Sequence, residues 1–291
     1  MDATVGSHRA SRSDTPNDGR LELVFAPDAE NRSFLAHQFA SYPFHVCRTQ
    51  YLDPEQPEMA SLYLQSSAGG LFAGDRLSVS ISVKAGAKAH VTTPASTIVH
   101  RMPEGKARQR TLLEAGPESL LEYLPDPIIL FPQARLRSGC HLRLGEGATA
   151  ILADAFLSHD PAAAGEPFGI YESETELTDA AGRRLMLDRF RVSGAEAQAS
   201  EVGVMGGRTM QATIFAVSNA VAPTTLQTAL RRAMETCGPS VYGAASLLPN
   251  SCGAWARLLA DDGAALKDAV ERLWSCAREA VTGVRPVPRR K

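Results

Sequence analysis

The sequence predicts a mainly β protein, with sheets stacked in a helix-like, solenoid-like arrangement and two or three α-helices near the C-terminus. Three observations lead to this fold class. One strand alternates almost perfectly between apolar and polar residues, turn glycines recur along the chain, and helical periodicity is confined to the C-terminal end. The same glycine spacing also fits an ordinary β-sandwich, so both arrangements stay open from the sequence.

The clearest strand covers residues 77–84. Its apolar side chains alternate with three serines and a lysine, which predicts one buried face and one hydroxyl face toward water or a partner. Gly86 offers the turn that follows, and residues 89–93 begin a return strand.

The turn glycines are Gly86, Gly116, Gly147 and Gly182, spaced about 30 residues apart. Each lies between two strand-like segments, as in a hairpin. A repeated hairpin cannot bury its own apolar face, so we expect the units to stack on one another.

Two helices are predicted after these strands. Thr224 or Thr225 is expected to cap the first, and Asp261 or Asp262 the second, which ends before Gly283. The apolar side chains of the second helix fall on one face, which predicts packing against the core. They are Leu266, Val270, Leu273, Trp274, Ala277 and Val281.

Composition limits the setting. The 30 basic and 32 acidic residues give a formal net charge of −2, which favours neither nucleic acid nor an anionic membrane as a partner. The five cysteines contain no CxxC pair, as is typical of a reducing compartment. With no signal-like or membrane-spanning stretch, the chain is expected to be soluble and cytoplasmic. We expect a disordered tail at 1–19, one domain at 20–285 and a basic tail at 286–291.

Four segments carry a family resemblance. They are LQSSAGGLFAGDRL at 64–77, TTPASTIVHR at 92–101, LEYLPDPIILFPQA at 121–134 and GEPF at 165–168. In this order and at roughly this spacing, they resemble the urease accessory protein UreD family, also called UreH. The resemblance spans about residues 20–285.

The resemblance implies a non-enzymatic chaperone for nickel delivery, built on a largely β, helix-like stack of sheets. Members bind apo-urease and recruit UreF and the GTPase UreG, and together they bring nickel and the carbon dioxide for lysine carbamylation to the urease site. No cofactor would be bound permanently, and nickel would be bound only transiently. This chain itself has no GxxxxGK[ST] motif, so GTP hydrolysis would belong to the partner.

Asp75 and Glu166 are the candidate metal-binding residues, because each follows a glycine in a segment that matches the family. In an internal polar passage, their carboxylates would offer weak, exchangeable positions for a divalent cation. The alternatives are a turn aspartate that caps its own backbone and a surface glutamate. The family commonly has Gly-Arg a few residues before the Gly-Glu pair, where this chain has Asp160-Pro161. That departure removes a potential arginine partner of Glu166.

The histidines and cysteines predict no tight metal site, because no two histidines are spaced i, i+4. His45 and Cys47 would share one face of a strand. Cys140 and His141 are adjacent and would face opposite sides.

Two other classes of function stay open. A hydrolase could use Asp160, Glu166 and Glu172 as an acid/base set, which requires two carboxyls at a defined separation. A carbohydrate-binding module would need exposed aromatic side chains, whereas Trp255 and Trp274 lie in apolar, core-like contexts.

Overall fold

The computed structural model describes residues 18–199, 201 and 203–288. Of the predicted tails, residues 1–17 and 289–291 lie outside the described residues, and the first strand already begins at Asp18. The strands are β1 (Asp18–Pro27), β2 (Ser33–Ala40), β3 (Phe44–Val46), β4 (Ala60–Ser66), β5 (Arg76–Val83), β6 (Lys88–Thr92), β7 (Thr97–Val99), β8 (Ala107–Ala115), β9 (Leu120–Leu124), β10 (Ile128–Leu130), β11 (Arg135–Leu144), β12 (Thr149–Ser158), β13 (Ile170–Asp179), β14 (Arg184–Ser193), β15 (Met210–Ser218), β16 (Val241–Leu247) and β17 (Gly253–Ala260). The helices are α1 (Gly194–Gln198), α2 (Pro223–Glu235) and α3 (Gly263–Thr282), with a 3-10 turn η1 (Pro249–Ser251).

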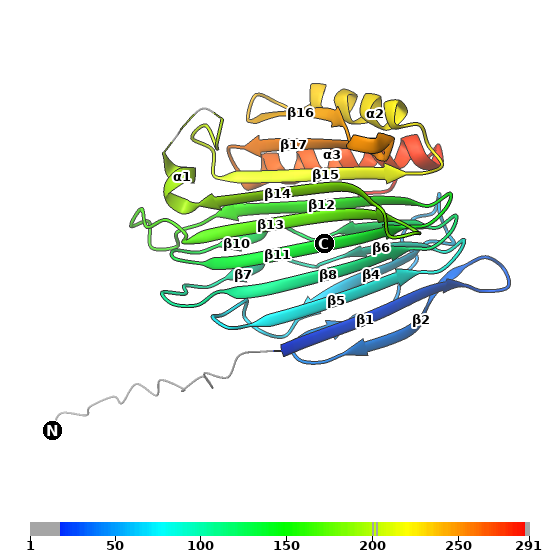
Figure 1. Ribbon diagram of the computed structural model, residues 1–291, viewed down its shortest axis with the longest axis horizontal. Helices are drawn as coiled ribbons and strands as arrows, with labels where there is room; N and C mark the ends of the chain where they lie inside the picture. Colours follow the sequence, from blue (N-terminus) through cyan, green and yellow to red (C-terminus); the bar gives the residue numbers. More distant parts are fainter. Residues whose placement is uncertain (1–17, 200, 202, 289–291) are drawn as a thin grey trace.

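The strands form two stacked sheets (Figure 1). A seven-stranded sheet has the order β14-β13-β11-β8-β5-β1-β2. A ten-stranded sheet has the order β16-β17-β15-β12-β9-β6-β4-β3, with β10 beside β12 and β7 beside β10. The apolar faces of both sheets meet in a common core, in which Phe25, Leu62 and Leu144 are fully buried.

The chain winds between the sheets as a β-solenoid of about 4 turns, which confirms the predicted stacked arrangement. β5, β8 and β11 each lie in the seven-stranded sheet and pair in parallel, while β6, β9 and β12, which follow them in the chain, pair in parallel in the ten-stranded sheet. The facing sheet is therefore the crossover that parallel strands require.

The hairpin interpretation of the turn glycines was wrong at three of the four positions. Gly86, Gly116 and Gly147 each follow a strand of one sheet and precede a strand of the other, so they form solenoid corners. Only Gly182 joins antiparallel neighbours, β13 and β14. A corner and a hairpin use the same turn residues, so the local sequence does not distinguish them.

Successive corners stack closely. The amide of Gly116 donates to the Val83 carbonyl at 2.8 Å, and the amide of Gly145 donates to the Ala115 carbonyl at 2.7 Å. A Cβ added at Gly116 would lie 2.8 Å from the Val83 carbonyl oxygen. A side chain there would separate the turns.

The helices cover the C-terminal end of the ten-stranded sheet, where α2 and α3 pack on β15, β16 and β17 (Figure 1). Asp262 caps α3 by accepting a hydrogen bond from the Ala265 amide at 2.8 Å, which confirms one predicted cap. The predicted caps of α2 were wrong: Ala222 is its N-cap and Pro223 its first residue, because proline is preorganised for that position. The predicted stripe of α3 is buried except at Val281, which is half-buried.

Candidate functional site

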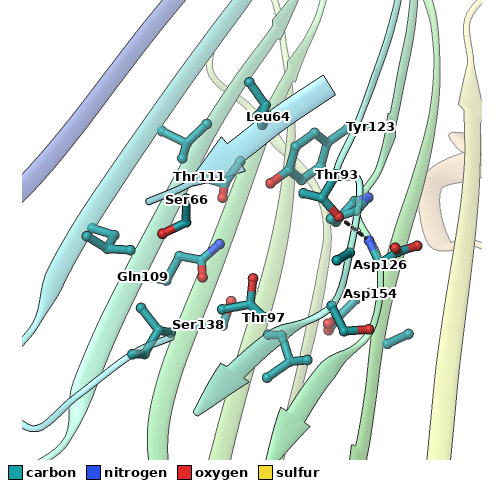
Figure 2. Close-up of a pocket in the computed structure, with 18 of the residues that line it drawn as sticks. Leu64, Ser66, Thr93, Thr97, Gln109, Thr111, Tyr123, Asp126, Ser138 and Asp154 are labelled. Carbon is teal, nitrogen blue, oxygen red and sulfur yellow. Dashed lines mark hydrogen bonds between the residues drawn. The ribbon is translucent and has the colours of Figure 1, made fainter. Parts of the chain in front are cut away.

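A cavity of about 620 Å³ lies between the two sheets, beside β3, β4 and β7. Figure 2 shows polar side chains from both sheets around this inter-sheet cavity. The seven-stranded sheet contributes side chains that alternate inward along β8, β11 and β13. The polar lining includes Ser66, Thr93, Thr97, Gln109, Thr111, Tyr123, Asp126, Ser138, Cys140, Asp154, Ser173 and Thr175.

Asp154 on β12 is an acid of the cavity wall that two hydroxyl groups hold in place. Its carboxylate accepts hydrogen bonds from the Ser173 hydroxyl at 2.7 Å and from the Tyr171 hydroxyl at 3.1 Å. Burial raises the pKa of Asp154, although these two bonds act the other way, and the negative charge of Asp188 raises it further. Asp154 therefore retains a proton to higher pH than an exposed aspartate does.

Cys140 lies close enough to Asp154 for an electrostatic interaction between the two side chains. Burial, with the carboxylate of Asp154 adding to it, raises the pKa of the Cys140 thiol to about 12. The group is a neutral thiol at neutral pH, which makes it a weak ligand because metals bind thiolate. The neighbouring His141 points to the opposite face and lies 3.1 Å from the Thr178 hydroxyl, as alternation along the strand predicted.

The predicted His45 and Cys47 pair does not converge on the cavity, since His45 lines it and Cys47 does not. Among the described residues, no group of three or more His, Cys, Asp or Glu side chains is placed to hold a metal ion. The cavity instead offers hydroxyls, a thiol and carboxyls, distributed over its walls. Such a donor set can accommodate a hydrated cation without retaining it.

Asp75 lies at the entrance of β5 and is 2 % exposed. Its carboxylate accepts a hydrogen bond from the Phe72 amide at 2.8 Å, and its backbone carbonyl accepts one from the Arg108 amide at 2.8 Å. The side chain caps the turn before β5, and the residues that line the cavity do not include it. A role of Asp75 in metal transfer stays a prediction.

Glu166 also lies apart from the cavity lining, and its carboxylate lies 3.0 Å from Arg101 Nη1 and also binds the Gln133 amide. Its backbone amide donates to Asp160 at 3.1 Å. Arg101 thus gives Glu166 the arginine partner that Asp160-Pro161 was expected to remove. The Glu166 metal role stays a prediction.

The acid/base set of a hydrolase finds no support in these electrostatics. Glu172 pairs with Lys106 at 2.9 Å, and this hydrogen bond lowers the pKa of Glu172. The pKa of Asp160 is also lowered, because hydrogen bonds from the backbone of Glu166 and its neighbours outweigh desolvation. A general acid needs a raised pKa. Trp274 is buried and Trp255 stacks on Phe215, so neither provides the exposed platform of a carbohydrate-binding module.

Sequence reasoning missed Asp154 and its hydroxyl partners. Its signal is nonetheless present, because Asp154 interrupts an apolar strand, TAILADAF, and a buried acid in such a run calls for partners. Tyr171 and Ser173 come from the next coil of the solenoid, 17 and 19 residues along the chain. Tyr171 and Ser173 meet Asp154 only because successive coils of the solenoid stack on one another.

Three of the segments that carry the family resemblance converge on the cavity. Residues 64–71, 93–98 and parts of 123–128 line it, although they lie in different coils. The fourth segment, which contains Glu166, contacts Arg101 and Gln133 at its own site.

Comparison with known proteins identifies the family. The model of the UreD urease accessory protein family matches residues 17–291. The chain belongs to this family. A "Urease accessory protein UreD 1" from Pseudomonas syringae pv. syringae (strain B728a) is 38% identical over 269 residues, covering 92% of this chain and 94% of that protein. A "Urease accessory protein UreD 1" from Methylorubrum extorquens (strain PA1) is 37% identical over 275 residues, which cover 94% of this chain and 91% of that protein. A "Urease accessory protein UreD" from Haloarcula marismortui is 33% identical over 278 residues, which cover 95% of this chain and 91% of that protein.

In the part of the chain that the structure describes, no helix of this UreD-family protein is long and apolar enough to cross a membrane.

Proposed function

We propose that this UreD-family chain acts in the maturation of urease. In this role it docks onto apo-urease together with UreF and the GTPase UreG, and nickel ions pass through the inter-sheet cavity on their way to the urease site. The protein acts as a scaffold and conduit in the cytoplasm, the reducing compartment that suits its five cysteines.

One observation carries the proposal: three of the four segments by which the chain resembles its family surround the same cavity. Segments that served only to stabilise the fold would be expected to lie throughout the hydrophobic core, which extends well beyond the residues around the cavity. The cavity therefore is the part of the molecule on which family function is expected to depend.

The chemistry of the lining supports transient binding of nickel. Nickel accepts imidazole, carboxylate and thiolate ligands, and His45, Asp126, Asp154 and Cys140 supply these groups in the lining. Burial keeps Cys140 protonated, and a raised pKa disfavours the anion of Asp154. A metal that binds here must displace a proton, so its affinity is weak and rises with pH.

The proposal is tested by reconstitution. Apo-urease, UreF, UreG, GTP, bicarbonate and nickel are incubated with and without this chain, and the nickel content of the re-isolated urease is measured together with urea hydrolysis. We expect nickel loading and activity to depend on the chain, and we expect the chain to co-purify with UreF. Equal loading in its absence would contradict the proposed function.

A further inference from the structure

The outer face of the seven-stranded sheet carries a group of exposed arginines that the cavity does not involve. In the parallel register Arg76 of β5 lies opposite Arg108 of β8, and Arg108 lies opposite Arg137 of β11. Arg110 follows two residues along β8 on the same face. All four side chains are exposed. Figure 1 shows β5, β8 and β11 side by side in this sheet. We call these four residues the arginine patch.

The arginine patch differs in its pairing from several basic side chains of the same face. These side chains pair with acids of neighbouring strands, as Arg189 does with Glu174 at 2.7 Å and Lys106 with Glu172 at 2.9 Å. Within the described residues, none of the four patch arginines has a carboxylate oxygen within 4.0 Å. The acids nearest in register are Asp18, opposite Arg76, and Glu172, opposite Arg137.

Three like charges in a row oppose the stability of the isolated sheet, because like charges directly opposite across strands repel. The surroundings leave the charges accessible. Gly139, which lies opposite Arg110 on β11, presents no side chain, and a Cβ built there would contact nothing within 4 Å. On the other side, Ser78 of β5 lies opposite Arg110 and adds a hydroxyl to the same face. A partner that supplied carboxylates would relieve the repulsion.

We propose that the arginine patch docks a carboxylate-bearing face of a partner protein in urease assembly. The proposal rests on the proposed function, because the partner is sought among apo-urease, UreF and UreG. A protein partner is favoured over nucleic acid or membrane because the face beside the patch carries charges of both signs. On β13, Glu172, Glu174 and Glu176 each pair with a basic side chain. A protein face can complement both signs of charge, whereas a phosphate-rich surface carries only one. The net charge of −2 points the same way.

The test compares two charge-matched triple variants of the full chain. Arg76→Gln, Arg108→Gln and Arg110→Gln together remove three of the four charges of the patch. Arg232→Gln, Lys267→Gln and Arg272→Gln together remove the same charge from exposed positions on α2 and α3. Binding of each variant to immobilised apo-urease, and separately to a UreF–UreG complex, is measured at about 50 and about 300 mM NaCl. Heparin and anionic vesicles serve as further probes, and thermal unfolding reports the effect on the fold.

For one of the two protein partners, we expect the patch variant to bind roughly tenfold more weakly at low salt, mainly through a slower association rate. The affinity of the wild type should fall with salt more steeply than that of the variant. The melting temperature of the patch variant should be equal to or higher than that of the wild type, because a repulsion has been removed. The helix variant should bind like the wild type.

Unchanged binding of the patch variant to both partners would overturn the proposal, and so would a loss confined to heparin or vesicles. An equal loss in both triple variants would overturn it too, since only net charge would then matter. A fall in melting temperature that matches the loss of binding would assign the arginines a structural role instead. If the wild-type chain binds neither partner and activates no urease, the proposed function itself fails. If instead the wild type activates urease and the patch variant binds and activates it equally well, the proposed function stands and only the role of the arginine patch fails.

Discussion

Two polar interiors lie on opposite faces of the same strand. On β9, Glu122 points toward α3 and Tyr123 points into the inter-sheet cavity. Beneath α3, Glu122 meets Arg278, Asp53 and His90 in a buried ion cluster. The cavity and the cluster both contain buried acids, but the cluster packs its charges directly against one another, whereas the cavity groups border open space.

The ion cluster is saturated. Arg278 is 1 % exposed and Glu122 0 %, and Arg278 Nε donates to Glu122 Oε1 at 2.5 Å. Arg278 Nη1 lies 3.0 Å from Asp53 Oδ2, and His90 Nδ1 lies 2.7 Å from Glu122 Oε2. Burial alone would raise the pKa of Glu122, but the charges of Arg278 and His90 outweigh it and lower the pKa to about 2. The cluster ties α3 to β6, β9 and the loop before β4.

The cavity, in contrast, encloses open space of about 620 Å³. Asp154 and Cys140 in its lining have raised pKa values and border this space, so a ligand can reach them. A buried polar group that is fully satisfied makes a structure rigid, whereas one with spare capacity can serve a ligand. The comparison predicts that changes in the cluster alter stability and that changes in the cavity alter nickel transfer.

The largest expected effect is that of Glu122→Gln. The substitution takes from the buried Arg278 its closest carboxylate and leaves Asp53 as a partner on one side, and it should destabilise the protein by about 3–5 kcal/mol. Urea unfolding of the variant and the wild type measures the difference. A loss of unfolding free energy below about 1 kcal/mol would show that the ion cluster does not stabilise the fold.

The wild type should lose part of this stabilisation in acid. Because folding lowers the pKa of Glu122 from 4.5 to about 2, the contribution is complete above the unfolded pKa and is lost as pH falls from about 5 toward about 2. Glu122→Gln should show a flatter stability profile over this range. Parallel profiles would assign the acid sensitivity to other groups.

Asp154→Asn in the cavity should have a smaller effect on stability than Glu122→Gln, and it should stabilise the protein instead of destabilising it. Folding raises the pKa of Asp154, so the wild type loses stability as pH rises from the unfolded pKa through the folded one. The variant lacks this loss and keeps an oxygen that can accept from Ser173. The difference in melting temperature, variant minus wild type, should be near zero in acid and grow with pH, while nickel transfer to urease falls. A variant that is less stable than the wild type at about pH 8 would show that the carboxylate is structural.

The smallest effect on stability is expected for Glu166→Gln. Its ion pair with Arg101 is partly exposed on both sides, and such pairs contribute at most about 1 kcal/mol. Thermal unfolding should therefore change little. This variant also tests the predicted metal role: unchanged nickel loading of urease would remove it.

The sequence predicted the repeated coil and the long C-terminal helix, because strand alternation, turn glycines and the Asp262 cap are local signals. It did not distinguish solenoid corners from hairpins, since that depends on which strands pair. The start of α2 was misplaced because Pro223 outweighed the threonines that follow it.

The site was less predictable than the fold. Asp75 stood out by its position after a glycine, yet its side chain serves the turn before β5. Asp154 and Cys140 approach each other only because β12 and β11 lie in facing sheets. The cluster joins Arg278 to Glu122 across 156 residues of chain. Periodicity within one segment carries no information about such contacts.

If nickel passes through the inter-sheet cavity, as we propose, filling the cavity should block its transfer to urease. Thr111 and Ser138 point into it from β8 and β11 (Figure 2). Thr111→Phe with Ser138→Phe narrows the space, and Thr111→Ala with Ser138→Ala is the matched control that keeps it open. The measurement is the nickel content of urease after reconstitution, for variants that still assemble with apo-urease and UreF. We expect low nickel content in urease with the phenylalanine pair and wild-type nickel content with the alanine pair. Full loading of urease by the phenylalanine pair would rule out passage of nickel through the cavity.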